Sequence, residues 1–187
     1  MLVYLFGAGL VLVLVGVILT YNTLVQKAQM ASNGWSDIDV QLKRRANLIP
    51  QLVTTVQGYA AHERALFADV AEKRAKAMAA GDDPASRADA ESALSQPVAR
   101  MMAIAEDYPE LKASGNFADL QKELSDTETK IEMARRFYNG AVRELNTAVQ
   151  SFPANLFAGL FGFRARSYFE IDMADRAVPK IDLGRSS

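Results

Sequence analysis

The sequence predicts an all-α protein in which an N-terminal transmembrane helix continues into an antiparallel up-down four-helix bundle. The first 20 residues contain no charged side chain and no proline. The remainder is rich in Ala, Leu, Glu, Gln, Lys and Arg, which are good helix formers, and it lacks the alternating valine-rich segments of strands. Apolar residues of the remainder recur at spacings of three and four, as on one face of a helix.

Residues 1–20 are predicted to span a membrane. A helix of this length is roughly 30 Å long, about the thickness of the hydrocarbon core of a bilayer. No Lys or Arg precedes the apolar run and no A-x-A site follows it, which argues against a cleaved signal peptide. A buried core helix would keep a polar face, whereas this run is apolar all round. Tyr4, Phe6 and Tyr21 suit the two interfacial regions of the bilayer.

The orientation of the span is predicted from nearby charge. Lys27 is the only basic residue within roughly 15 residues of its ends. This charge predicts that the N-terminus is outside and that the C-terminal bundle is cytoplasmic. The chain has no cysteine, so no disulfide framework indicates an oxidising compartment.

The first two bundle helices are predicted at residues 21–47 and 50–80. The first has its apolar positions on one face, at Leu24, Ala28, Ala31, Trp35, Ile38 and Leu42. Pro50 lacks an amide hydrogen and suits the first position of a helix, so we expect a tight turn before it. One continuous helix with a kink at Pro50 is the alternative. Gly81 is suited to end the second helix.

The other two helices are predicted at residues 84–112 and 117–151. Asp83 before Pro84 has the pattern of an N-cap followed by a first helical residue. Asn116 is the predicted N-cap of the last helix, which keeps an apolar 3-4 spacing throughout. Short turns make neighbouring helices antiparallel, so the Gly81 loop and the chain after residue 151 should lie at the membrane-proximal end.

An apolar amphipathic segment, residues 152–170, follows the bundle. With two residues near the span it supplies the candidate membrane or partner contacts, which are Tyr21, Lys27, Phe157, Leu160, Phe161, Phe163, Arg164 and Arg166. The aromatic rings could lie at the headgroup boundary, with the arginines near lipid phosphates. The alternative is that the segment folds back to close the base of the bundle or packs on a neighbouring subunit. Residues 171–187 form a polar tail.

Several stretches together resemble the signature of the LemA family. They are Trp35–Arg45, Leu48–Val53, Gly58–Ala60, His62-Glu63, Tyr138-Asn139, Ala141-Val142, Phe152-Pro153 through Phe163, and Tyr168–Glu170. The resemblance runs from Tyr21 to about Glu170 in the order of the family. It implies a bacterial inner-membrane protein with one N-terminal span, a long-helix bundle and no established biochemical activity. Some relatives are linked to magnetosome membrane formation and others are encoded beside membrane proteases.

The side chains that most enzymes need are scarce in this sequence. It has one histidine, His62, and no cysteine, so two Glu-x-x-His motifs or an H-E-x-x-H motif cannot be built. A Ser-His triad could use only His62, which has no nucleophile elbow nearby. Gly7-Ala8-Gly9 lies within the span and cannot cradle a phosphate. We therefore predict no catalytic, cofactor-binding or metal-binding residues.

Charge excludes bulk attraction to nucleic acid. The formal net charge is −1 at pH 7 and the isoelectric point is about 5.9. The cluster Lys43-Arg44-Arg45 is interpreted as solvated surface, as are Asp37 and Asp39, one of which could bridge helices. Asn139 and Asn146, seven residues apart, could set helix register or could simply be exposed.

These observations predict a membrane-anchored helical scaffold or adaptor that acts through protein and membrane contacts. Its predicted partners are the lipid bilayer and further copies of itself in a homo-oligomer. The alternative is a regulatory partner of a membrane protease or envelope-stress system. A hydrolase is a third and more distant reading.

Overall fold

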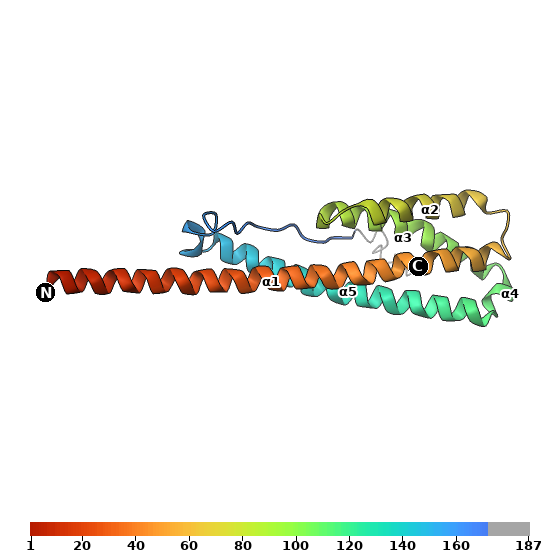
Figure 1. Ribbon diagram of the computed structural model, residues 1–187. Coiled ribbons are helices and arrows are strands. Elements are labelled where there is room, and N and C mark those ends of the chain that lie inside the picture. Colours follow the sequence, from red (N-terminus) through yellow and green to blue (C-terminus); the bar gives the residue numbers. More distant parts are fainter. Residues whose placement is uncertain (172–187) are drawn as a thin grey trace, which may run out of the picture.

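The computed structural model describes residues 1–171, and in this range the chain is helical with no β-strand (Figure 1). The helices are α1 (Leu2–Gln57), α2 (Arg64–Ala79), α3 (Pro84–Glu106), α4 (Pro109–Lys112), α5 (Gly115–Gln150) and the 3-10 turn η1 (Ala154–Leu156). The all-helical prediction agrees with this structure. Residues 172–187, most of the predicted polar tail, lie outside the described residues.

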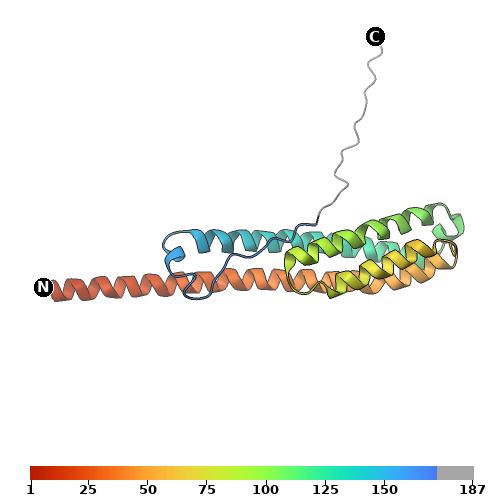
Figure 2. The same cartoon turned by 90° about the horizontal axis from the view of Figure 1, so that it is seen from above.

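Helix α1 runs the whole length of the molecule, and α5 runs antiparallel beside most of it (Figures 1 and 2). Lys27 Nζ lies 3.0 Å from Glu144 Oε2, and Arg44 NH2 lies 2.9 Å from Glu123 Oε1. Residue numbers rise along α1 as those of its partners fall along α5, which defines the antiparallel register. The end near Tyr21 is called the proximal end below, and the end near Gln57 the distal end.

Gly34 lets α1 and α5 approach closely. A Cβ atom at this position would lie 3.0 Å from both Phe137 Cδ1 and the Cα of Tyr138. Such a distance is shorter than ordinary van der Waals contact, so a larger residue would push the helices apart. The space that glycine leaves is therefore filled by α5.

The predicted turn before Pro50 is wrong, because α1 continues through this proline to Gln57. Pro50 has no amide hydrogen, so the carbonyl of Ala46 loses its usual helical donor. Arg74 of α2 replaces it, with Nε donating to the Ala46 oxygen at 2.6 Å. The alternative of one continuous helix holds because a side chain from another helix bonds the freed carbonyl.

The remaining helices also differ from their predicted bounds. The turn that reverses the chain follows Gln57, and α2 begins only at Arg64. Residues 84–112 form two helices, because Pro109 disfavours the helical conformation in Tyr108, whose backbone is extended (φ −116°, ψ 92°). The last helix begins at Gly115 with Ser114 at its N-cap, and Asn116 is not the cap.

Helix α2 has only 16 residues, so it returns only part of the way toward the proximal end. The Gly81 loop therefore lies partway along the α1–α5 pair, and its predicted place at the membrane-proximal end is wrong (Figure 1). The prediction that Asp83 caps α3 is confirmed, because its carboxylate accepts the Ser86 amide hydrogen at 2.9 Å. Four helices surround the core only in the distal half.

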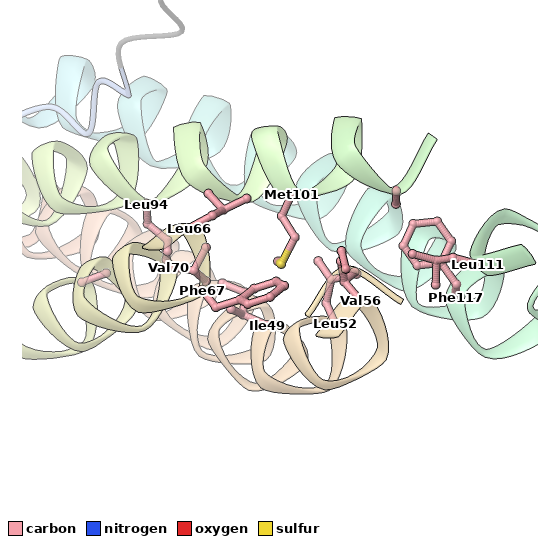
Figure 3. Close-up of a cluster of buried hydrophobic side chains, with 13 residues drawn as sticks. Ile49, Leu52, Val56, Leu66, Phe67, Val70, Leu94, Met101, Leu111 and Phe117 are labelled. Carbon is pink, nitrogen blue, oxygen red and sulfur yellow. The ribbon is translucent and has the colours of Figure 1, made fainter. Parts of the chain in front are cut away.

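Two apolar clusters make up most of the core. The distal cluster joins all five α-helices and includes Leu52, Phe67, Leu94, Met101 and Phe117, shown in Figure 3. The second cluster lies nearer the proximal end and joins α1, α5 and the start of α3 to two residues of the C-terminal segment, Phe169 and Ile171. The C-terminal segment thus takes the place that α2 and α3 leave open in the proximal half.

Candidate membrane interface and C-terminal strap

Residues 152–163, called the collar below, pack against α1 where its buried face begins. Ala154 and Ala158 are buried against Leu24, and Phe163 packs on the same cluster. The ring of Tyr21 meets Phe161 at 5.2 Å and Phe163 at 5.7 Å between centroids, both edge to face. The collar therefore covers one side of α1 at the end of its apolar part, around Tyr21 and Leu24.

Part of the collar remains exposed and apolar. Phe152, Leu156 and Leu160 are 80%, 63% and 82% exposed. They lie at the same end of the molecule as residues 2–16 of α1, all of which are exposed as well. The collar thus packs on α1 with its small residues and Phe163 while presenting large apolar side chains outward. The packing alternative thus applies to Ala154, Ala158 and Phe163, and contact of the segment with a bilayer stays a prediction.

The predicted basic residues have different surroundings. Lys27 is engaged with Glu144 on α5, and its side chain is 27% exposed. Arg164 and Arg166 are exposed and form no ion pair within residues 1–171. The prediction that residues 152–170 stay together at the proximal end is wrong beyond Phe163, because the chain then turns back along the helices (Figure 1).

Residues 164–171, called the strap below, are held by two asparagines of α5. Asn146 Oδ1 accepts the Arg166 amide hydrogen at 2.8 Å, and its Nδ2 donates to the Arg166 carbonyl at 3.0 Å. Asn139 bonds the amide and the carbonyl of Phe169 in the same way, both at 3.0 Å. Each amide side chain therefore satisfies one donor and one acceptor of a segment that has no ladder partner.

The spacing of these asparagines matches the strap. Seven helical residues rise about 10.5 Å, and three residues of extended chain cover about 10 Å. Asn139 and Asn146 can therefore bind Phe169 and Arg166 in register. These bonds reach only backbone atoms, so they fix the path of the strap independently of its side chains.

One side chain anchors the strap in the core. Phe169 is fully buried, with its ring centroid 5.6 Å from that of Trp35. The Tyr138 hydroxyl donates to the Ser167 carbonyl at 2.9 Å, and burial raises the pKa of this hydroxyl. Tyr138 therefore stays protonated at neutral pH and keeps its hydrogen bond to the strap.

A buried charge cluster separates the two apolar clusters. Arg45 of α1 binds the carboxylate of Glu91 on α3 and lies 3.0 Å from Glu128 of α5. Arg87 Nε donates to the other oxygen of Glu91 at 3.1 Å and lies 3.7 Å from Asp39. The interpretation of Arg45 as solvated surface is wrong, because its side chain is only 7% exposed. Asp39 does bridge helices.

No constellation for catalysis is assembled within the described residues. His62 lies in the distal turn with its side chain 70% exposed, and its Nε2 is 3.1 Å from the Tyr108 hydroxyl. No group of three or more His, Asp or Glu side chains in this part of the chain is arranged to hold a metal ion. The described residues instead form an exposed apolar surface at the proximal end and a pair of asparagines on α5 that bind the backbone of the strap.

Comparison with known proteins gives the family of this chain. The LemA family model matches residues 34–183, which is most of the sequence. The chain belongs to the LemA family. Within residues 1–171, α1 is also the one helix that is long and apolar enough to cross a membrane. An 18-residue stretch of it has a mean hydropathy of 2.8, and none of this stretch is buried.

The LemA chain is similar to magnetosome proteins. It is 25% identical to "Magnetosome protein MamQ" of Magnetospirillum gryphiswaldense, over 86% of this chain and 68% of the relative. It is also 25% identical to "Magnetosome protein MamQ 2" of Paramagnetospirillum magneticum, over 82% of this chain and 65% of that protein. The chain thus spans about two thirds of the length of these relatives.

Sequence reasoning and structure agree only in part on the candidate site. The structure brings Tyr21, Phe161 and Phe163 together, and it places Phe157 half-buried beside them in the collar. Leu160 is exposed in the collar, while Lys27 is occupied by an ion pair. The asparagine pair was noticed by its spacing, but its role in binding backbone was missed. Two asparagines seven residues apart on one helix, followed by a strand-like C-terminal segment, are the signal that could have indicated this backbone binding.

Proposed function

We propose that this LemA protein is a membrane-anchored helical scaffold or adaptor, with one span and a second contact to the bilayer through the collar. The observation that carries the proposal is the exposed apolar surface at the proximal end, made by the first part of α1 and by Phe152, Leu156 and Leu160. Water disfavours such a continuous apolar surface, which a bilayer would cover.

The orientation and the membrane are part of the same proposal. The predicted cytoplasmic side for the helical domain is supported only by Lys27 and, closer to the collar, by Arg164 and Arg166. A bacterial inner membrane is the proposed location. These cations would lie near lipid phosphates if the collar meets the headgroup region.

A scaffold or adaptor role is supported by the large apolar side chains exposed at the proximal end. The similar proteins are named as magnetosome proteins, and these names report no reaction. We propose self-association in the plane of the bilayer as the mode of assembly. Binding to a membrane protease is the second candidate.

The membrane contact can be tested with single cysteines, because the chain has none of its own. Leu160→Cys and Met133→Cys, the latter 55% exposed on α5, are labelled with the same fluorophore in full-length protein. The protein is placed in nanodiscs of phosphatidylcholine that carry a lipid-borne quencher. We expect strong quenching at Leu160 and little at Met133. Equal quenching at the two positions would refute the collar contact.

Assembly is tested separately. The mass of the full-length protein in detergent and in nanodiscs should exceed that of one chain, and a monomer in both would contradict self-association. Crosslinking in native membranes followed by purification distinguishes further copies of this chain from a protease. Labelling Ser186→Cys from either side of the membrane tests the orientation.

A further inference from the structure

A hollow between α5 and the strap is lined by three arginines. It has a volume of about 430 Å³, and it is lined by Arg135, Arg136, Asn139, Gly140 and Arg143 of α5 with Tyr168 and Glu170 of the strap. Arg136 is paired with Glu132 at 2.6 Å. Arg135 and Arg143 form no ion pair within residues 1–171. The lining of the hollow therefore has more positive than negative charge.

Gly140 lies among these arginines, four residues after Arg136 and three before Arg143. Glycine inside a helix is less stable than alanine, so its presence there needs a reason. Packing does not supply one, because a Cβ atom at Gly140 would have nothing within 4 Å, in contrast to Gly34. Its backbone is helical like that of its neighbours, so conformation does not require glycine either. The missing side chain instead leaves space between the guanidinium groups.

The free arginines can converge on this space. Side chains of a helix lean toward its N-terminus, which directs Arg143 over Gly140. Arg135 and Arg143 are eight residues apart, or about 12 Å along the helix, so one long side chain can enter the hollow from each end. The planar guanidinium group binds oxyanions through two parallel hydrogen bonds. The exposed hydroxyl of Tyr168 is a further donor at the wall of the hollow.

We propose that this hollow binds a soluble multivalent oxyanion of the phosphate class. Arg135 and Arg143 are its ligands, and the backbone at Gly140 is the floor on which it lies. Glu170, the one acidic residue that lines the hollow, repels any anion there. We therefore expect two or more negative charges on the ligand to be needed, so that attraction by the arginines exceeds this repulsion.

The phosphates of lipid headgroups are too far away to be this ligand. Gly34 of α1 lies against Tyr138 of α5, and Gly140 is two residues from Tyr138 toward the proximal end. The hollow is therefore roughly 17 Å along α1 from Tyr21, where the proposed span ends. The headgroup region adds only about 5–8 Å to each side of the hydrocarbon core. The anion must then come from solution.

Titration of the full-length protein with sodium pyrophosphate tests the site. Binding is measured by calorimetry in neutral detergent micelles at constant ionic strength, with sodium acetate as the singly charged comparison. We expect saturable binding of pyrophosphate and none of acetate. Arg143→Gln should lower the pyrophosphate affinity about tenfold or more, because it removes a charged hydrogen-bond donor. No saturable binding of pyrophosphate, or equal binding of acetate, would overturn the proposal.

The matched control is Arg100→Gln on α3. Arg100 is exposed and forms no ion pair within the described part of the chain, so its removal changes the net charge by the same amount. We expect it to change the pyrophosphate affinity less than about twofold, because screening weakens the effect of distant charges. An equal loss in Arg100→Gln and Arg143→Gln would show attraction by net charge alone and would contradict a defined site.

Gly140→Leu separates binding from folding. Leucine is the better helix former and has room at this position, so the Tm should stay the same or rise. The leucine side chain fills the hollow, however, and the pyrophosphate affinity should fall about tenfold or more. Glu170→Gln removes the repelling charge and should raise the affinity about two- to fivefold. Natural affinity in Gly140→Leu would refute the assignment.

Nanodiscs distinguish the two sources of phosphate. At about 0.1 M ionic strength charges more than about 10 Å apart are largely screened. The pyrophosphate affinity should therefore be the same in nanodiscs of phosphatidylcholine and in nanodiscs that contain phosphatidylglycerol. A loss of binding in the anionic nanodiscs would show that headgroups occupy the hollow, against the proposed soluble ligand. The titration in micelles does not depend on the bilayer contact of the collar, so it can succeed or fail independently of the proposed function.

Discussion

The continuity of α1 through Pro50 depends on one hydrogen bond from another helix, and this bond can be tested in a double-mutant cycle. Arg74→Met keeps most of the aliphatic part of the side chain but removes the donor to the Ala46 carbonyl. Ala46 is 4% exposed, so water cannot readily replace that donor. A buried acceptor left without a partner costs about 1–3 kcal/mol.

In a Pro50→Ala background the cost of Arg74→Met should be much smaller. Residue 50 then has an amide hydrogen, which can bond the Ala46 carbonyl as in an ordinary helix. We expect a coupling free energy of about 1–2 kcal/mol between the two positions. With a urea m-value of about 2 kcal/mol per M, the Arg74→Met midpoint should fall by about 1 M in the natural background.

The cycle is measured by urea unfolding in detergent micelles. Trp35, the single tryptophan, reports tertiary packing and far-ultraviolet circular dichroism reports helix content. Lys76→Met is the control. It removes a cation from the same helix as Arg74, but this cation pairs only with the exposed carboxylate of Glu72. Equal destabilisation by Arg74→Met in both backgrounds would show that Arg74 does not compensate for the proline.

Three further changes test the strap, the charge cluster and the cap of α3. Asn139→Ala removes both hydrogen bonds to the Phe169 backbone, and we expect a loss of about 2 kcal/mol in unfolding free energy with faster hydrogen exchange at the Phe169 amide. Glu91→Gln leaves the buried cation of Arg45 without its closest counter-charge, and urea unfolding should show a loss of about 3 kcal/mol or more. Hydrogen bonds from the Ser86 amide and hydroxyl lower the pKa of Asp83, so Asp83→Ala should lower the urea midpoint more at about pH 7 than at acidic pH, where the carboxylate becomes protonated.

Each of these three predictions has its own control and contradicting result. Gln150→Ala removes an exposed amide from the same helix, and equal hydrogen exchange of the strap in both variants would contradict the role of Asn139. Glu132→Gln breaks an exposed pair with Arg136, and an equal loss there would show that burial of the charge cluster does not matter. A lowered Asp83 pKa stabilises the folded state above the unfolded value of 3.8 and not below the folded pKa. A difference between the natural chain and Asp83→Ala that is equally large at about pH 7 and about pH 2 would refute the assignment.

Local sequence signals predicted several features well. The N-terminal helix was predicted from composition, because a long uncharged apolar run favours an apolar helix whatever packs around it. The cap at Asp83 followed from the residues beside it, since an aspartate before proline satisfies amide groups within three residues. The last long helix was predicted within two residues of its bounds from its apolar spacing.

The candidate site was predicted less well because its contacts are distant in sequence. The collar residues were singled out by their apolar character, but no periodicity indicates which of them pack and which remain exposed. Asn139 could be read as register, subunit contact or surface, because its partner, Phe169, lies 30 residues away. The bounds of the strap likewise depend on the two asparagines that bind it.

The sequence by itself determined the helical composition, the apolar N-terminal helix, the cap of α3 and the LemA resemblance, because each depends on residues within a few positions of one another or on short motifs. Only the tertiary structure decided that α1 passes through Pro50, that Arg45 is buried and that the strap replaces α2 and α3 in the proximal half. Ala46 and Arg74 are 28 residues apart, and Arg45 and Glu91 are 46 apart. A carbonyl without its donor or a charge without water is stable only when such a distant partner is brought to it, and the local pattern carries no record of that partner.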